Sequence, residues 1–515
     1  MVCGEHTMAD IVLCTLNAAY GHSSLALRYL QANLGPLRER SVIRESIIGV
    51  RPAELVETLL RDEPRIVAFG VYVWNVIDTL AVIKVLKAVR PDIDIVIGGP
   101  EVSHEHDAQE IVACADFVVP GEGELVFAEL AEKLLAGRRP LIKVQPEQLP
   151  DPKQLESPYH LYTDEDIANR ALYVEASRGC PFTCEFCLSA LPIKVRQFDI
   201  AQLLTDLASL YERGARQFRF IDRTFNLSYA TSAQILEFFL ERKDEGIFVH
   251  FEMVPDRFPE KLRDLVVQFP PGAMQFEIGV QTFDEVIAER IGRRQDNAAV
   301  DANIRFLREH SGVHIHSDLI AGLPGEDLAT FGHGFNRLWA ARPHEIQLGI
   351  LKRLRGTPIA RHDQEWQMVY ASSAPYEILQ NSCISFSDMQ RIKRAARVWD
   401  LVGNSGNFGY ALSAFEHHGD PFNELMRFSD WLYEQLGPLV GIALQRLCKL
   451  FISYFSGPVG MDEQVVGAMV ARSYIAPGRR LPDFLMDYGV EELATRPTST
   501  APRRQARHLA TAGRS

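Results

Sequence analysis

The chain has 515 residues, of which 47% are hydrophobic and 23% are charged, and its formal net charge is -13 at pH 7. This length exceeds one ordinary hydrophobic core and predicts two or three domains, while the composition excludes wholesale disorder. The negative charge argues against a nucleic-acid substrate, because phosphate binding needs a positive surface. No apolar run is long enough to span a bilayer and the cysteines show no disulfide framework, so we expect a cytoplasmic protein without a membrane partner.

Residues 9 to 140 alternate short apolar strands with segments of helical period. This alternation predicts parallel strands joined by crossover helices. The expected fold class is α/β, and this domain is expected to be a doubly wound parallel sheet of the flavodoxin or Rossmann type. Its strands are expected at 11–15, 41–47, 65–73, 93–98 and 116–119, and its helices include 25–34, 77–89 and 125–135.

The carboxyl ends of these strands are rich in glycine and polar residues. Ligands of doubly wound sheets bind beyond such ends, although any single glycine turn could be no more than a tight connection. Together the ends resemble the cobalamin-binding domain that precedes the barrel in one branch of radical S-adenosylmethionine (SAM) enzymes. The resemblance implies that the residues nearest to cobalamin are Asn17, Tyr72, Trp74, Asn75, Gly98, Gly99, Pro100, Glu101, Gly121, Glu122 and Gly123.

The sequence lacks the D-x-H-x-x-G motif by which other cobalamin proteins supply a histidine to cobalt. His22 follows the first strand, but its Tyr-Gly-His-Ser setting does not have that spacing, so we expect a polar pocket residue or a helix-start residue there. The resemblance therefore implies cobalamin without a histidine lower ligand, with the loop at 72–75 on that face. An empty, vestigial domain stays open as an alternative.

Residues 141 to 168 are rich in proline and charge, and we interpret them as a linker. Residues 169 to 358 then repeat a strand and a helix six times, which predicts a partial (β/α)6 TIM-like barrel with its active site at the C-terminal ends of the strands. The strands are expected at 172–175, 217–222, 248–253, 274–280, 314–320 and 345–350.

Three cysteines follow the first of these strands, at Cys180, Cys184 and Cys187. Thiolates so closely spaced can converge on one inorganic centre, and three of them leave one iron of a cubane cluster open, since that cluster takes four. Reduced core cysteines are a poor explanation for three thiols within eight positions. A structural zinc site would need a second arm of ligands nearby.

The spacing C-x-x-x-C-x-aromatic-C is similar to the signature of radical SAM enzymes, with Phe186 in the aromatic position. The resemblance implies a 4Fe-4S cluster on Cys180, Cys184 and Cys187. Its open iron would chelate SAM and deliver the electron that splits SAM into a 5'-deoxyadenosyl radical. An external donor such as a flavodoxin or ferredoxin is expected, because a low-potential cluster needs one.

Further polar residues lie at the ends of the other predicted barrel strands. The turn at 320–325 resembles the segment that backs the adenine of SAM. For Glu252, Arg257 and Asp318, a structural ion pair explains the pattern as well as function does. The resemblance implies that hydrogen bonds to the ribose and methionine portions of SAM come from Asp222, Thr224, Glu277 and Gln281.

Residues 359 to 490 predict a mainly helical domain, and residues 491 to 515 lack an apolar period and are expected to form a disordered basic tail. The implied reaction is cobalamin-dependent methyl transfer to an unactivated carbon of a small-molecule or peptide substrate. Radical rearrangement or ring contraction on the same scaffold is an alternative. A methylthiotransferase would need a second cluster, which Cys3, Cys14 and Cys114 do not clearly supply. A non-catalytic cobalamin or redox sensor is the remaining alternative.

Overall fold

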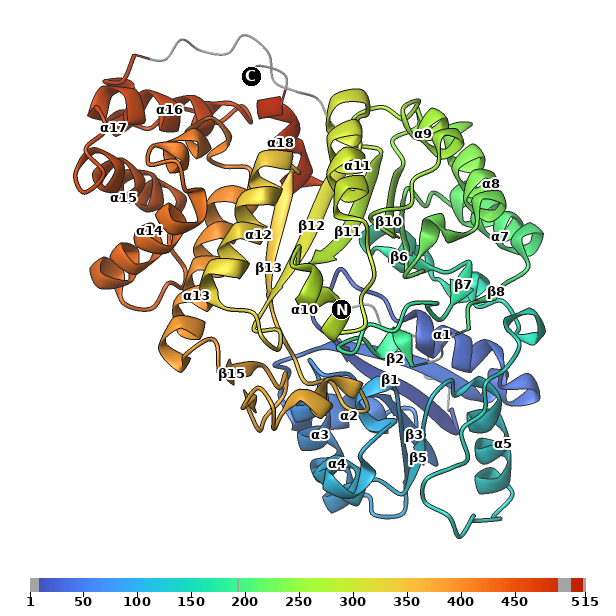
Figure 1. Ribbon diagram of the computed structural model, residues 1–515. Helices are drawn as coiled ribbons and strands as arrows, with labels where there is room; N and C mark the ends of the chain where they lie inside the picture. The colour runs from blue at the N-terminus through green and yellow to red at the C-terminus, as the bar shows by residue number, and fades with distance from the viewer. Residues whose placement is uncertain (1–8, 192–193, 490–501, 513–515) are drawn as a thin grey trace. The chain divides into compact units, whose positions relative to one another are not determined.

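The computed structural model describes residues 9–191, 194–489 and 502–512, which belong to two compact units (Figure 1). The first unit comprises residues 1–223, 352–360 and 371–377, and the second comprises residues 224–351, 361–370 and 378–515. The division falls within the predicted barrel at 169–358. The fold therefore groups the residues differently from the domain boundaries expected from the sequence.

A five-stranded parallel sheet forms the centre of the first unit, in the order β2-β1-β3-β4-β5. This is the flavodoxin-like order of doubly wound folds. All five predicted strands are confirmed, and they span Ile11–Asn17 (β1), Ser41–Ile47 (β2), Ile66–Gly70 (β3), Asp94–Gly98 (β4) and Phe117–Val119 (β5).

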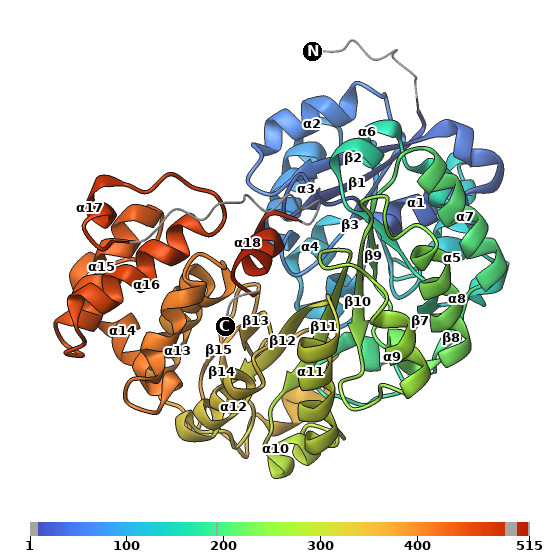
Figure 2. The same ribbon diagram turned by 90° about the horizontal axis from the view of Figure 1, so that it is seen from above.

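Helices cover both faces of this sheet, and Figure 2 shows α2 and α3 on one side and α1 and α5 on the other. Two separate groups of buried apolar side chains result, one beneath α2 to α4 and the other beneath α1 and α5. The helices are α1 (Leu25–Ala32), α2 (Pro52–Leu60), α3 (Val76–Val89), α4 (Glu110–Cys114) and α5 (Glu124–Leu135).

The rest of the first unit contains the start of the predicted barrel. Strands β6 (Leu172–Val174) and β9 (Gln217–Phe220) pair in parallel, whereas β7 (Ser177–Arg178) and β8 (Arg196–Gln197) form an antiparallel pair. Helix α6 (Asp164–Asn169) begins inside the segment that we expected to be a linker, because Thr163 and Asp166 form a capping box at its start. Helix α7 (Ile200–Glu212) follows β8.

The second unit has four parallel strands in the order β13-β12-β11-β10. They span Phe248–Met253 (β10), Met274–Gln281 (β11), His314–Ala321 (β12) and Glu345–Ile350 (β13), close to the predicted ranges. In β11 buried and half-buried residues alternate along the strand, so one face is packed and the other is polar. The helices between and beside these strands are α8 (Tyr229–Leu240), α9 (Glu260–Val266), α10 (Glu285–Arg290), α11 (Asn297–His310) and α12 (Leu328–Ala341).

The later part of the second unit is helical, as predicted, apart from a short hairpin of β14 (Val369–Tyr370) and β15 (Ile378–Gln380) that the sequence did not indicate. Aromatic side chains such as Phe415, Phe428 and Phe451 form its core. The helices are α13 (Phe386–Trp399), α14 (Pro421–Leu436), α15 (Leu444–Ser456), α16 (Glu463–Ile475) and α17 (Asp483–Met486).

The expectation of a disordered tail at 491–515 is wrong for its later part, where Arg503–Ala512 form helix α18. The helix docks through polar contacts that apolar periodicity does not detect. Arg504 bonds to Asp400 and Glu345, and the ring of His508 bonds to the carbonyl oxygen of Asn404 at 2.9 Å. Residues 490–501 and 513–515 lie outside the described residues.

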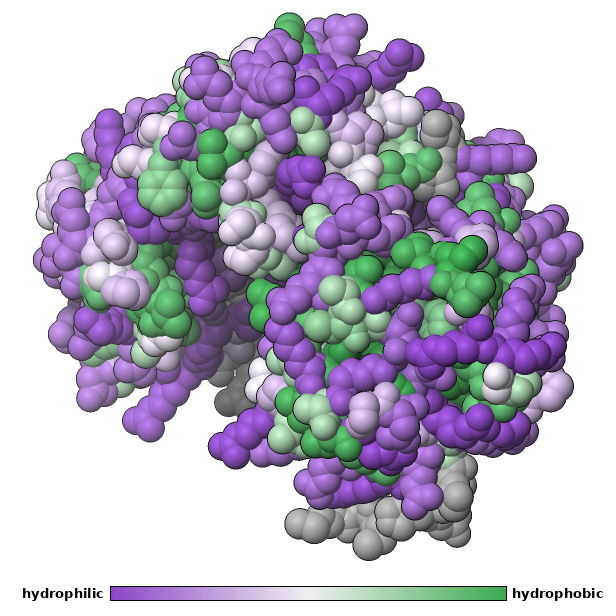
Figure 3. All heavy atoms as spheres, turned by 90° about the horizontal axis from the view of Figure 1, so that it is seen from below, coloured by the Kyte–Doolittle hydropathy of each residue, from purple (hydrophilic) through white to green (hydrophobic). Residues whose placement is uncertain are grey.

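Hydrophilic residues cover most of the face drawn in Figure 3, with smaller hydrophobic patches between them. Among the described residues, we find no helix that combines the length and the apolar character needed to cross a bilayer.

Candidate functional site

The three cysteines lie on the connection between β7 and β8, after the first predicted barrel strand. Cys180 and Cys184 are buried and Cys187 is half-buried. The amide of Cys187 donates to the carbonyl oxygen of Cys184 at 3.1 Å, which curls the chain back on itself. Burial raises the pKa of Cys180, and the neighbouring thiols of Cys187 and Cys184 add to this effect. The three predicted ligands therefore share one curled loop, and the other two thiols are near enough to Cys180 to affect its pKa.

Two contacts from the first unit hold the cysteine loop in place. The amide of Ile359 donates to the carbonyl oxygen of Glu185 at 3.0 Å, so the returning segment at 352–360 supports the loop. Asp222, at 3% exposure, accepts hydrogen bonds from the amide of Ala176 at 2.9 Å and the hydroxyl of Ser177 at 2.6 Å. Burial raises the pKa of Asp222 to about 7. In this structure Asp222 orients the strand that leads into the loop.

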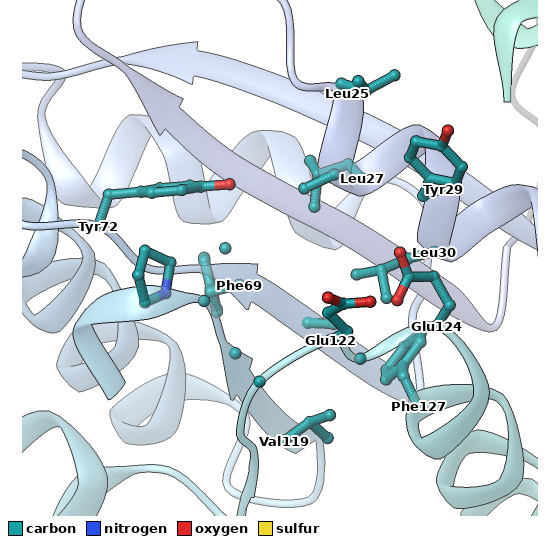
Figure 4. Close-up of a pocket in the computed structure, with 18 of the residues that line it drawn as sticks. Leu25, Leu27, Tyr29, Leu30, Phe69, Tyr72, Val119, Glu122, Glu124 and Phe127 are labelled. Atoms are coloured by element: carbon teal, nitrogen blue, oxygen red, sulfur yellow. The ribbon is translucent and has the colours of Figure 1, made fainter. Parts of the chain in front are cut away.

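A cavity of about 260 Å³ lies in the first unit at the carboxyl ends of its strands. Figure 4 shows Leu27 and Leu30 of α1 near its centre, Tyr72 on one side and the carboxylates of Glu122 and Glu124 on another. Seven of the residues predicted from the resemblance line it: Tyr72, Gly98, Gly99, Pro100, Gly121, Glu122 and Gly123.

The glycines of these turns suit a cavity that a flat group enters. A Cβ atom at Gly99, where φ is +105°, would lie 2.6 Å from the backbone oxygen of Val71. A Cβ atom at Gly123 would lie 3.2 Å from a methyl carbon of Val119 and 3.5 Å from one of Leu30, both of which line the cavity. Glycine therefore keeps the turns narrow and the cavity open. Most of the lining is apolar, and its charged residues lie at one end.

Four predicted cobalamin residues do not line this cavity. The amide of Asn17 donates to Glu45 at 2.6 Å, and Asn75 is fully buried, with bonds to the backbone of Tyr72 and Leu16. Glu101, at 3% exposure, accepts bonds from Arg355 at 2.9 Å and from Tyr376 at 2.6 Å. These three side chains form hydrogen bonds to other protein groups near the strand ends. A role in contact with the cofactor stays a prediction for them.

Trp74 is the fourth, and it is 49% exposed. Its ring stacks on Tyr72 with centroids 4.4 Å apart and an angle of 7°. Because the flat pair stands at the carboxyl end of β3, it provides an aromatic surface beside the cavity. His22, which we did not expect to reach cobalt, bonds through Nδ1 to the hydroxyl of Tyr173.

Sequence reasoning missed an acidic and basic cluster at one end of the cavity, formed by Glu122, Glu124, Glu175, Arg178 and Arg196. Arg178 lies two residues before Cys180, so the cysteine motif gave a signal for it. Glu122 was predicted from its glycine-rich turn and Glu175 lies three residues before Arg178, but the sequence did not indicate that these residues meet Arg196. Burial raises the pKa of Glu175, although Arg178 opposes the effect.

Of the predicted SAM residues of the second unit, Glu277 and Gln281 lie on the polar face of β11, whereas Thr224 lies in the loop that follows β9. Glu277 bonds to His250 Nε2 at 3.1 Å. Gln281 has φ of +71° at a bulge in the pairing of β11 with β12, and its Oε1 has no hydrogen-bond partner among the described residues. Thr224 is buried at 5% exposure, and its hydroxyl likewise has no such partner. Polar atoms are thus available for a ligand at these strand ends.

Asp318 lies on the same polar face, where it pairs with His316 at 3.3 Å. Burial acts to lower the pKa of His316, but Asp318 and nearby carboxylates raise it to about 9. This supports the structural interpretation of Asp318.

Three family models match the chain in succession. A B12 binding domain matches residues 12–131, the radical SAM superfamily matches residues 174–336, and a protein family of unknown function, DUF4080, matches residues 364–490. The first match covers most of the five-stranded sheet, and the second contains the cysteine triplet. The chain thus contains a B12 binding domain followed by a radical SAM domain. The matched domains assign it cobalamin, a 4Fe-4S cluster and SAM as cofactors.

Several relatives of this protein are named as methyltransferases. The uncharacterized methyltransferase PH0819 of Pyrococcus horikoshii is 26% identical over 333 residues, which cover 59% of this chain and 70% of that protein. The cobalamin-dependent radical SAM methyltransferase TokK of Streptomyces tokunonensis is 26% identical over 329 residues, 56% of this chain and 47% of TokK. The match thus spans about half the length of TokK. A tRNA-2-methylthio-N(6)-dimethylallyladenosine synthase of Bdellovibrio bacteriovorus is more distant, at 23% identity over 273 residues, 51% of this chain and 58% of that protein.

The solved structure of the cobalamin-dependent SAM radical enzyme OxsB with aqua-cobalamin bound has a TM-score of 0.59 to this radical SAM protein. The likeness covers 93% of this chain and 79% of OxsB, at 15% sequence identity. At that identity it shows the fold alone. It confirms the expected α/β class, with an N-terminal Rossmann-like sheet, a radical SAM domain and a helical C-terminal region.

Proposed function

We propose that this enzyme transfers a methyl group from SAM, by way of cobalamin, to an unactivated carbon of a small-molecule or peptide substrate. The observation that carries the proposal is that one compact unit holds both the cysteine triplet and the glycine-rich cavity. The cavity lies mostly in the part of the chain that the B12 binding domain model matches, which supports a corrinoid as its ligand.

When bound, the cluster, SAM and cobalamin supply a radical and a transferable methyl group. The protein's part is to bind and orient them. Cys180, Cys184 and Cys187 hold the cluster, and Asp222 fixes the strand that carries their loop. The stacked rings of Tyr72 and Trp74 would offer bound cobalamin a flat aromatic surface beside the cavity.

The polar face of the second unit would receive SAM. Gln281 and Thr224 have unpartnered polar atoms that can bond to hydroxyl or amino groups, and Glu277 is a carboxylate beside His250. These assignments are proposals drawn from the resemblance and from the open hydrogen-bonding capacity of the side chains.

The methylthiotransferase alternative is disfavoured by Cys14, which is completely buried within the apolar group beneath α2 and α3. Burial raises its pKa far above the ordinary value, so it is a poor cluster ligand. Cys3 lies outside the described residues. Radical rearrangement is the second candidate, because it would use the same cluster and the same cavity.

The test uses anaerobic protein reconstituted with iron, sulfide and hydroxocobalamin, then supplied with reductant and SAM labelled as CD3 on the methyl group. We expect 5'-deoxyadenosine and label transferred to cobalamin. 5'-Deoxyadenosine without label on cobalamin would favour rearrangement, and neither product would contradict the proposal.

The variant Cys184→Ala should lose the cluster and both products. A matched control is Cys383→Ala, which removes a half-buried thiol of the second unit outside the triplet and should leave both products unchanged.

A further inference from the structure

The two ends of the cysteine loop are anchored on one turn of the cobalamin cavity. Arg178 and Arg196 face each other in the β7–β8 pair, directly before and after the loop. Arg178 donates to Glu122 at 3.0 Å, and Arg196 donates to the same carboxylate at 3.1 Å. Glu122 belongs to the turn that lines the cavity. The loop therefore rests on a residue that a cavity ligand would approach.

Arg178 is held tightly by further partners. Its guanidinium bonds to Glu175 at 2.8 Å and to Glu124 at 2.7 Å, and it lies over the ring of Tyr29, 4.6 Å from the centroid. The side chain is 13% exposed. A planar guanidinium with its donors so distributed cannot move without disturbing all of its partners.

On the side that faces the cavity, the charged cluster has more carboxylates than guanidinium groups. Among the described residues, the three carboxylates of Glu122, Glu124 and Glu175 form ion pairs with two guanidinium groups, those of Arg178 and Arg196. Glu124 is 5% exposed, and its Oε2 has no hydrogen-bond partner among the described residues. Figure 4 shows its carboxylate beside that of Glu122 in the cavity. A buried carboxylate oxygen without a partner is costly, so a donor group of a ligand would relieve it.

We propose that Glu124 accepts a hydrogen bond from an amide or hydroxyl group of the corrinoid and that Arg178 transmits this binding to the cysteine loop. Glu124 is the binding residue and Arg178 is a positioning residue. The inference rests on the proposed function, because it takes the cavity ligand to be cobalamin and the centre on the loop to be the cluster. Binding at the two places is then coupled, and each cofactor changes the affinity for the other by the same factor.

The experiment measures the dissociation constant of hydroxocobalamin for the full chain with and without the reconstituted cluster. We expect the two constants of the wild type to differ by about fivefold or more. In Arg178→Lys, which keeps the charge and loses the planar fork, both cofactors should still bind but the two constants should become equal. The low-temperature electron paramagnetic resonance signal of the reduced cluster should change with cobalamin in the wild type and not in this variant.

Glu124→Gln tests the binding residue separately. We expect its affinity for hydroxocobalamin to fall by about tenfold, because a charged acceptor is replaced by an amide. Glu129→Gln is the matched control, since Glu129 is an exposed residue of the same helix, α5, and should keep the affinity of the wild type.

The role of Arg178 would be overturned if the wild type had the same dissociation constant for hydroxocobalamin with and without the cluster. It would also be overturned if the two constants of Arg178→Lys differed as much as those of the wild type. Full affinity in Glu124→Gln would overturn the binding role. If Arg178→Lys fails to hold a cluster, Glu122→Gln provides the second test, and coupling of wild-type size in that variant would also count against transmission. Failure of the proposed function has a different result, in which the wild type binds no cobalamin or no cluster at all.

Discussion

The strands of the two units are built in different ways. In β1 the residues from Ile11 to Leu16 are all buried, because helices cover both faces of the sheet. In β11 buried residues such as Phe276 alternate with half-buried ones such as Glu277. The first arrangement confines polar chemistry to the strand ends, whereas the second allows it along a whole face. Accordingly, the cavity lies at the strand ends of the first unit, whereas Glu277 and Gln281 lie along the polar face of β11 in the second.

The largest effect should come from the doubly covered strand. Leu13→Ala removes a completely buried side chain from β1 and should cost about 2–5 kcal/mol in the free energy of unfolding. The measurement is hydrogen exchange of amides in the first unit, which reports that unit separately. A loss of less than about 1 kcal/mol would mean that this face of the sheet tolerates cavities, against the packing described here.

A smaller effect is expected from Glu345 on the polar side of the second unit. Its carboxylate bonds to the buried ring of His314 at 2.9 Å and to the part-exposed Arg504 at 2.8 Å. Glu345→Ala removes the partner of the buried His314 ring and should cost about 1–3 kcal/mol in the free energy of unfolding. The loss should appear first as faster hydrogen exchange in α18. Glu309→Ala, an exposed change in the same unit, should have no such effect. If hydrogen exchange in α18 were equally fast in Glu345→Ala and Glu309→Ala, Glu345 would have no role in holding that helix.

The docking of α18 should also depend on pH. Burial lowers the pKa of His508 to about 4, below its ordinary value of 6.5. His508 binds a proton more readily when α18 is released from the protein than when it is docked. Docking of α18 should therefore weaken as the pH falls from about 6.5 towards 4. His314 and His344, whose pKa values burial also lowers, act in the same direction.

The raised pKa of His316, which despite burial comes from Asp318 and other carboxylates of the strands, acts oppositely on the stability of the second unit as a whole: its contribution is present below pH 6.5 and is lost as the pH rises towards 9. Exchange rates of α18, corrected for the intrinsic effect of pH, measure the balance. In His508→Gln the change between pH 6.5 and 5 should be smaller than in the wild type. An identical pH profile in this variant would contradict the assignment to His508.

The smallest effect on stability is expected for Glu277→Gln. Its side chain is 36% exposed and pairs with a histidine, so the free energy of unfolding should change by at most about 1 kcal/mol. The affinity for SAM should nevertheless fall, because the substitution removes a negative charge from the predicted site. Equilibrium binding of SAM to the cluster-loaded protein measures this. A large loss of stability with unchanged affinity would make Glu277 a structural residue.

Much of the architecture could be predicted because it depends on local patterns. The strands of both units begin and end within a few residues of the expected positions, since apolar residues recur with the periods of strands and helices. The hairpin β14–β15 was missed because each strand has only two or three residues, too few for a period. Helix α6 was missed because a capping box and not an apolar stripe starts it.

By itself the sequence determined the cysteine triplet, the glycine turns and the order of the domains, because ligand spacing and periodicity are properties of neighbouring residues. Only the tertiary structure decided that Asp222 orients the strand before the cysteine loop, that Glu101 is tied to Arg355, and that α18 is a docked helix. It also decided that Arg178 and Arg196 meet at Glu122. Each of these depends on polar contacts between residues far apart in the chain, and such contacts leave no period in the sequence from which they could be predicted.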